Sequence, residues 1–274
     1  MFGLPWHIVF PTLLGTVFAG LSCGAIGVFV VRLKLSSLGF AMSHAAFTGA
    51  ALGLLLAMDP LWMALAFSLL IALVLGPLTD ASRLNPDTAL AALFPVTMAL
   101  GFVFLTKVPG TGARSSAMSL LWGSALGVTL QQAASLGVVT VLVALALLVF
   151  GKGFIALLLD RKLALSSGLN ANGYYYGVLV LAALVVSVTL RVTGGLLVYT
   201  LIALPASSAF QWVYDIKKAF ALSAVLGAVS AIAGFLVSLW ADLPLGSAIA
   251  LSTAGLFLFS VVCSPKRRTR RQNA

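Results

Sequence analysis

Long apolar runs separated by short polar connectors make up almost the whole of this chain. Nine of these runs come close to the length of about 20 residues that an α-helix needs to cross a hydrocarbon core about 30 Å thick. The pattern therefore predicts nine membrane-spanning helices. They cover residues 8–31, 39–57, 61–78, 88–105, 131–150, 174–190, 196–212, 219–240 and 247–262.

One further apolar stretch, residues 116–128, is too short to cross a membrane and is predicted to form a re-entrant or interfacial half-helix. Backbone of that kind is tolerated in a membrane only where protein or water covers it. The expected fold class is all-α, a polytopic integral membrane bundle of about eight to nine transmembrane helices plus this short helix. Residues 1–263 would form the transmembrane domain, and residues 264–274 a basic cytoplasmic tail.

The composition agrees with a membrane protein and excludes an ordinary soluble one. Hydrophobic residues are 61% of the chain and charged residues only 8%, against about 25% charged in soluble proteins. The formal charge of +10 comes from 16 Lys and Arg, which lie in the connectors and not along one exposed face. Their placement favours orientation of helices against the membrane over nucleic-acid binding.

The distribution of the basic residues predicts the orientation of the chain. Nine spans put the two termini on opposite sides, and a cytoplasmic C-terminus places most of the basic residues inside, as the positive-inside rule requires. We therefore expect an outside N-terminus and an inside C-terminus. The inside set is Arg32, Lys34, Arg83, Lys152, Arg161, Lys162, Lys217, Lys218, Lys266, Arg267, Arg268, Arg270 and Arg271, and the outside set is Lys107, Arg114 and Arg191. The cluster from Lys266 to Arg271 is interpreted as a solvated stop signal against anionic lipid.

The positions of the acidic residues limit the energy sources that could drive transport. All six are aspartates, and each is predicted at a loop or a membrane edge, so none is available at mid-membrane to bind a coupling proton or sodium ion. The sequence also lacks the glycine-rich phosphate loop that binds ATP. These two observations leave a passive channel or a permease driven by a separate ATPase.

A long connector on the predicted inside favours the second choice. Residues 152–173 exceed what a simple crossing needs, and within them Asp160, Ala164 and Gly168 outline a short interfacial helix. An acidic start and a closing glycine in a left-handed conformation are typical of such a helix. It could dock into a groove of a partner protein, although an ordinary interfacial connector has the same pattern.

Several segments, in one order along the chain, resemble the zinc, manganese and iron permeases of bacterial ATP-driven metal importers. The resemblance covers nearly the whole sequence. The segments are Gly27-Val28-Phe29-Val30-Val31-Arg32 with Met42-Ser43-His44-Ala45 and Gly49, Leu121-Trp122-Gly123-Ser124, Asp160 with Ala164 and Gly168, Gly195-Leu196-Leu197-Val198 with Leu204-Pro205-Ala206 and Ala209, and Asp242-Leu243-Pro244-Leu245-Gly246.

The resemblance implies a multi-pass permease of the bacterial cytoplasmic membrane that imports a divalent transition metal, zinc first and manganese or iron next. It implies a cytoplasmic ATP-binding subunit, which would meet Asp160, Ala164 and Gly168, an extracytoplasmic metal-binding protein, and a second permease copy. The metal would be the transported ion, with no permanently bound cofactor. Membrane lipid is the remaining expected partner, and nucleic acid is not one.

One position departs from the family pattern. Family members usually carry an acidic residue four positions before the histidine of the Ser-His-Ala segment, where this chain has Phe40. Positions four apart share a helix face, so an acid there could bind a cation together with His44. Without it, a site at His44 is better suited to zinc than to manganese.

His44 is the histidine predicted well inside a span, and it is the candidate metal ligand, with hydrogen-bonded packing as the alternative. Cys23 and Met42 could add soft ligands, but Cys23 lies among small residues where a thiol usually packs inertly. His7 is predicted to be an interfacial anchor. Gly195 and Pro205 are candidate gating positions because glycine and proline kink helices, which packed helices also tolerate.

Two alternatives of another class are a passive membrane pore and a non-transporting scaffold. An intramembrane enzyme is excluded by the absence of a local nucleophile and base. Ser43 and His44 are adjacent, so on a helix they point about 100° apart and cannot form a dyad.

Overall fold

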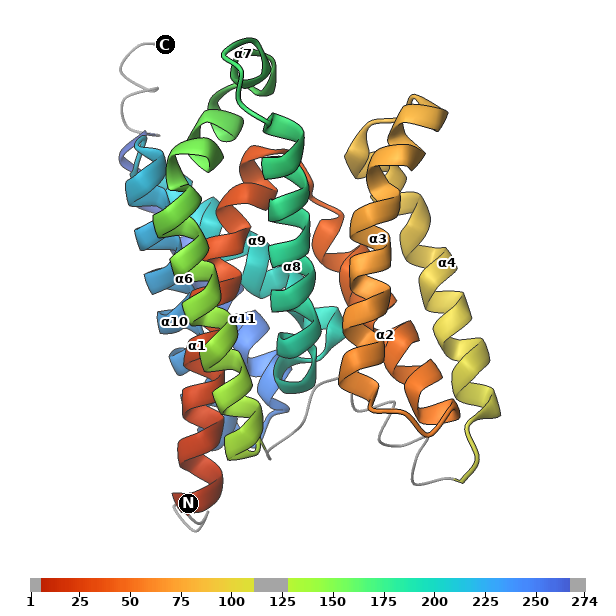
Figure 1. Cartoon of the computed structure of the whole chain (residues 1–274). Helices are drawn as coiled ribbons and strands as arrows, with labels where there is room; N and C mark the ends of the chain where they lie inside the picture. Colours follow the sequence, from red (N-terminus) through yellow and green to blue (C-terminus); the bar gives the residue numbers. More distant parts are fainter. Residues whose placement is uncertain (1–5, 111–127, 267–274) are drawn as a thin grey trace.

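The computed structural model describes residues 6–110 and 128–266, and the described part is helical throughout (Figure 1). The expected all-α fold is therefore confirmed. Eight of the described helices are long and apolar enough to cross a membrane. The helices are α1 (Trp6–Arg32), α2 (Leu38–Leu55), α3 (Pro60–Ser82), α4 (Pro86–Lys107), α6 (Leu130–Leu159), α7 (Arg161–Ser166), α8 (Ala171–Thr193), α9 (Gly195–Trp212), α10 (Ile216–Ala241) and α11 (Leu245–Val262). All nine predicted spans coincide with one of these helices, the seventh with α9.

Local sequence explains where several of the helices begin. Asp59 precedes Pro60, and its carboxylate accepts a hydrogen bond of 2.7 Å from the backbone N–H of Leu61. Asp215 does the same for Lys217 at the start of α10, also at 2.7 Å. Thr129 and Gln132 form a reciprocal capping box at the start of α6. Such caps satisfy N–H groups that have no partner within the helix.

The predicted boundary was wrong in one place. The connector expected at residues 152–173 is mostly helical, because α6 continues through Leu159 and α8 already begins at Ala171. Lys152 does not end α6, since the residues after it are apolar up to Asp160, where the backbone becomes extended. Residues 111–127, which contain nearly all of the predicted half-helix at 116–128, lie outside the described residues.

The helices form two groups with a shared middle (Figure 1). Helices α2, α3 and α4 pack together on one side, α1, α6, α10 and α11 on the other, and α8 and α9 contact members of both groups. Helices α1 and α2 are mostly buried, whereas α3, α4 and α6 expose most of their apolar side chains. This distribution is the one that a lipid-surrounded bundle requires, with apolar residues on its outer surface.

Small residues let the inner helices approach one another closely. A side chain at Gly20 of α1 would collide with the backbone of Gly227 on α10, and one at Gly27 would collide with the carbonyl oxygen of Ile202 on α9. Close backbone approach at glycine is a usual form of helix association in membranes, where apolar packing alone gives little preference for one partner. Helix α1 is thus held against both α9 and α10.

All six aspartates lie at or near helix ends, as the sequence predicts. Asp59 caps α3 and also pairs with Arg191 near the end of α8, with 3.2 Å between nitrogen and oxygen. Asp87, in the first turn of α4, accepts a hydrogen bond of 2.6 Å from the backbone N–H of Ser37, just before α2. These carboxylates fix helix ends to one another, so they serve the bundle's assembly. Asp80, Asp160, Asp215 and Asp242 complete the set.

A single residue, Gly194, separates α8 from α9. Its φ of +82° lies in the region that only glycine adopts readily, and it lets the chain reverse direction within one residue. The break between the spans predicted at residues 174–190 and 196–212 is therefore present.

Candidate functional site

Helix α2 carries the candidate metal ligand through the interior of the bundle. It contacts α3, α4, α8 and α9, and 78% of its span is buried. Ala41, Ala45 and Gly49 are among the small residues that let these neighbours approach it. His44 lies in its second turn and is fully buried.

The imidazole of His44 has no hydrogen-bond partner for either ring nitrogen among the residues that the structure describes. Its nearest ring neighbour is Phe94 of α4, which it meets edge to face with centroids 4.7 Å apart. A buried polar group without a partner costs about 1–3 kcal/mol, so packing alone does not explain a histidine here. The described residues thus show no hydrogen bond for the packing alternative, and the role of His44 as a ligand stays a prediction.

Aromatic side chains from three helices lie one turn before His44. The ring of Phe40 stacks on Tyr199 of α9 at 4.2 Å and lies 5.9 Å from the ring of Phe94. Gly39 makes room for this arrangement, since a Cβ at that position would lie 3.1 Å from the Tyr199 ring. The position where the family pattern has an acid is thus filled by an apolar ring that packs between α4 and α9.

The other candidate ligands do not gather around His44. Within residues 6–110 and 128–266 there is no group of three His, Cys, Asp or Glu side chains that could hold a metal ion. The thiol of Cys23 faces Thr189 of α8 at 3.8 Å, which accounts for its burial by packing. Met42 is buried, and its carbonyl oxygen accepts a hydrogen bond of 3.1 Å from Ser68 of α3. His7 is exposed near the start of α1.

The hydroxyl of Thr48 links α2 to α4 one turn after His44. It donates to the carbonyl oxygen of His44 at 2.8 Å and lies 2.5 Å from the carbonyl oxygen of Thr97. A hydroxyl has one hydrogen, so these two contacts share it. This contact holds the backbone at His44 in place against α4, on which Phe94 also lies.

The short helix α7 lies at one end of the bundle, beyond α6 and α8 (Figure 1). The Asp160 carboxylate accepts a hydrogen bond of 3.2 Å from the N–H of Leu163, and Ala164 is buried against the bundle. Gly168 closes the helix with a φ of +81°, and the N–H of Leu169 donates to the carbonyl oxygen of Ala164 at 3.1 Å. These contacts form the capped helix that the spacing predicts, and they leave its role as a coupling element a prediction.

Helix α7 is held against α8 and carries leucine side chains that are exposed on the surface of the protein. The Arg161 guanidinium lies 4.7 Å from the centroid of the Tyr175 ring and donates a hydrogen bond of 2.7 Å to Asn172. Leu163 and Leu165 are 68% and 47% exposed. A rigidly held helix with protruding apolar side chains is suited to a groove of another protein.

The two candidate gating residues lie on α9. Gly195 is its first residue, and a Cβ there would come within 2.9 Å of the Leu190 side chain and 3.7 Å of Ser43, the neighbour of His44. Pro205 is buried within the helix and removes the backbone hydrogen bond that would reach residue 201. Both residues therefore affect the helix that carries Tyr199.

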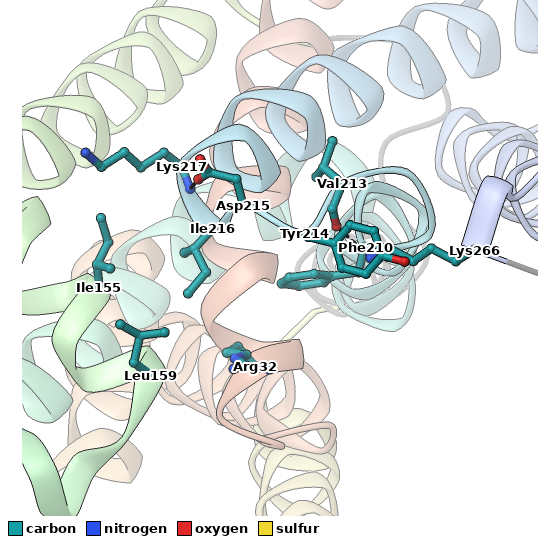
Figure 2. Close-up of a pocket in the computed structure, with 10 residues that line it drawn as sticks. All are labelled: Arg32, Ile155, Leu159, Phe210, Val213, Tyr214, Asp215, Ile216, Lys217 and Lys266. Carbon is teal, nitrogen blue, oxygen red and sulfur yellow. Dashed lines mark hydrogen bonds between the residues drawn. The ribbon is translucent and has the colours of Figure 1, made fainter. Parts of the chain in front are cut away.

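A cavity of about 470 Å³ opens at the α7 end of the bundle (Figure 2). Lys266 reaches into it and donates to the carbonyl oxygens of Phe210 and Val213 at 2.6 and 2.7 Å, with its ammonium 3.8 Å from the Tyr214 ring centroid. Desolvation by burial lowers the pKa of Lys266. Ser264 also bonds to this helix end, donating to Gln211. The tail expected to be solvated is therefore attached to the end of α9 at its first residues, because the last carbonyls of a helix lack partners.

Comparisons with known proteins agree on one family. The model of the ABC 3 transport family matches residues 6–264. The manganese import system permease protein ScaB of Streptococcus parasanguinis is 30% identical over 271 residues, 97% of this chain and 94% of that protein. The high-affinity zinc uptake system membrane protein ZnuB of Haemophilus influenzae is 25% identical over 256 residues, 93% of this chain and 97% of that protein.

A solved structure has the same fold over nearly the full length. It is that of PsaBC from Streptococcus pneumoniae in complex with Fab, with a TM-score of 0.87 and 28% sequence identity. The match covers 98% of this chain and 96% of the matched chain.

Proposed function

Because the chain belongs to the ABC 3 transport family, we propose that it carries a divalent transition metal across the membrane past His44, with zinc as the first ion and manganese or iron next. As a member of this family, the chain is the membrane-spanning permease subunit of a metal-ion ABC importer. ATP hydrolysis takes place in a separate subunit, so the permease is not itself an enzyme. The passive pore and the scaffold do not fit this family.

One observation carries the proposed path. His44 is fully buried in α2, and neither of its ring nitrogens has a hydrogen-bond partner in the described part of the chain. A neutral imidazole with a free nitrogen is the commonest side-chain ligand for transition metals. A passing ion would satisfy a nitrogen that the described residues leave unpaired, and a single strong ligand would still let the ion leave.

The preference for zinc rests on what surrounds the imidazole. Phe40 and Phe94 contribute apolar rings where a carboxylate would supply a hard oxygen. Manganese favours carboxylate and carbonyl oxygens, whereas zinc accepts imidazole readily. Relatives named for both metals exist, so the identity of the ion depends on the residues of this chain.

The exposed face of α7 supports a docking role for the ATP-binding subunit. Leu163 and Leu165 protrude from a helix that Arg161 holds against α8. In this proposal the α7 end is cytoplasmic, the N-terminus is outside, and the permease lies in a bacterial cytoplasmic membrane as one of two copies. A metal-binding protein would deliver the ion at the opposite end.

Uptake of several metals by the reconstituted importer tests the proposal. Proteoliposomes that hold the permease and its ATP-binding subunit are prepared with and without ATP. Zinc, manganese and iron are then added to the external medium at equal concentrations. The expected result is ATP-dependent accumulation with zinc highest, and loss of accumulation in His44→Ala. Manganese exceeding zinc would contradict the order of ions, and unchanged uptake in His44→Ala would contradict the path.

A further inference from the structure

A second, larger hollow lies on the outer surface of the bundle, away from His44. It has a volume of about 790 Å³ and runs between α6 and α10, with α1 as its floor. We call it the α6–α10 groove. Leu147 and Leu148 line it from α6, Phe220 and Ala224 from α10, and Ala25 from α1. Its size is within the range of small-molecule sites.

The interior of the groove is apolar even where hydroxyls line it. Ser22 donates to the carbonyl oxygen of Phe18 at 2.8 Å, and Thr140 donates to that of Leu136 at 2.8 Å. Because these hydrogens are used by the backbone of their own helices, the hydroxyls direct no free donor into the groove. The groove is thus suited to a hydrocarbon chain.

One end of the groove carries two positive charges. Lys152 of α6 and Lys217 of α10 both line it, both are exposed, and neither forms an ion pair with any residue of the described segments. Figure 2 shows the Lys217 side chain extending away from Lys266, on the side of the cavity where Ile155 of α6 lies. The neighbouring Arg32 and Lys266 differ, since both donate hydrogen bonds to helix-end carbonyls.

The depth of these lysines agrees with the level of lipid headgroups. Helix α6 has 30 residues, which at 1.5 Å per residue is about 45 Å and exceeds a hydrocarbon core of about 30 Å. Lys152 lies seven residues before the end of α6, and Lys217 lies in the first turn of α10. A lysine at such a depth extends its ammonium to the interface, where lipid phosphates lie.

We propose that the α6–α10 groove binds one anionic phospholipid, with an acyl chain between Leu148 and Phe220 and the phosphate between Lys152 and Lys217. Charge complementarity selects the occupant: a zwitterionic lipid offers the same chains but no net charge to two free ammonium groups. The site is separate from the metal path, because none of its lining residues belongs to α2, α4 or α9. It therefore stands or fails independently of the proposed transport function.

Lipid retention by the full chain tests this site. The purified protein is reconstituted in nanodiscs of phosphatidylcholine and phosphatidylglycerol, released into mild detergent, and the retained lipids are counted by native mass spectrometry. The unaltered chain should keep one phosphatidylglycerol in preference to phosphatidylcholine. Replacing Lys152 and Lys217 by Gln should lower that retention by about fivefold for each lysine, the factor expected for one basic residue near an anionic surface.

Two control pairs make the result specific. Lys34→Gln with Lys218→Gln removes the same charge from residues that do not line the groove, and should leave retention unchanged. Gly151→Phe adds a ring to the lining of the groove while keeping both lysines, and a Cβ at Gly151 meets no atom within 4 Å. Gly255→Phe is its match on α11, with equally open space and no part in the groove. Gly151→Phe should lose the lipid and Gly255→Phe should keep it.

Several outcomes would overturn the site. They are equal retention of both lipids by the unaltered chain, retention unchanged in both the lysine pair and Gly151→Phe, or equal losses in the control variants. A second permease copy is the competing occupant. In a Cys263→Ser background, a disulfide-linked dimer formed through Leu148→Cys in the membrane would show that protein covers the groove, and would also overturn the proposal.

Discussion

The ring of Phe40 lies against the ring of Tyr199 with their centroids 4.2 Å apart and their planes 25° from parallel. This contact joins α2 to α9 one turn before His44, at the position where the family resemblance led us to expect an acid. An aromatic contact therefore occupies the place of the expected carboxylate beside the proposed metal path.

Phe40→Asp should shift the importer toward manganese. A carboxylate one turn before His44 shares its helix face and supplies a hard oxygen ligand, so manganese uptake should rise relative to zinc. The variant should also be less stable by about 0.5–1.5 kcal/mol from the lost ring stacking. Competitive uptake of the two metals is the measurement, and Phe40→Leu is the control that loses the stacking without adding an acid. A manganese-to-zinc ratio equal in the two variants would contradict the prediction.

His44→Ala should reduce metal uptake at least about tenfold while the complex with the ATP-binding subunit stays assembled, since a lost ligand costs no less than an altered outer contact. The comparison with His44→Gln separates ligand from packing. An amide of similar reach keeps the polarity and approximate volume of the side chain, so recovery by Gln would mean that His44 only packs. Uptake at matched expression, with copurification of the partner, gives the answer.

Gly168→Val should uncouple ATP hydrolysis from uptake. A Cβ at Gly168 meets nothing within 4 Å, so the cost of the change is the strain of a left-handed residue, about 1–2 kcal/mol, borne by the end of α7. Gly110→Val is a close control, with a φ of +84° and equally open surroundings. Metal-stimulated ATPase activity should fall in the first variant only. Equal effects of the two changes would assign the loss to backbone strain in general.

The two turns at the ends of α3 should lie on opposite sides of the membrane. Met58 and Leu84 are both exposed, at 54% and 45%, one before and one after that helix. With Cys263 replaced by serine, an impermeant thiol reagent added to whole cells should label Met58→Cys, and Leu84→Cys only after permeabilisation. Labelling in the reverse order would invert the proposed orientation.

The membrane-spanning helices could be predicted from the sequence, but the face that each helix turns toward the interior of the bundle could not. A run of apolar residues fixes that a helix crosses a membrane, and all nine runs became helices. Which side faces inward is not encoded in such a run, because lipid and protein interior are equally apolar. The contacts of Phe40 with Tyr199 and of His44 with Phe94 therefore had no signal in the pattern.

Charged residues do not mark the helix ends reliably in this chain. The sequence predicts a connector from Lys152, but this residue lies within α6, because a long lysine side chain can reach the interface from inside a helix. The sequence predicts a solvated tail at Lys266, but its ammonium donates hydrogen bonds to the last carbonyls of α9. By contrast, the short helix at Asp160, Ala164 and Gly168 could be predicted from the sequence, because helix caps and left-handed glycines depend on residues close by in the chain.

Gly194 limits how α8 and α9 can move. One residue contributes two soft torsion angles, φ and ψ, and no slack in length, because the peptide units on either side of it are rigid planes. A displacement of α8 at this end must therefore appear in the first turn of α9 with almost no loss. The first turn of α9 contains Val198 and is followed by Tyr199, which rests on Phe40. The covalent connection alone thus couples a displacement of this end of α8 to the space beside His44, whereas the two torsion angles of Gly194 can absorb a pure tilt.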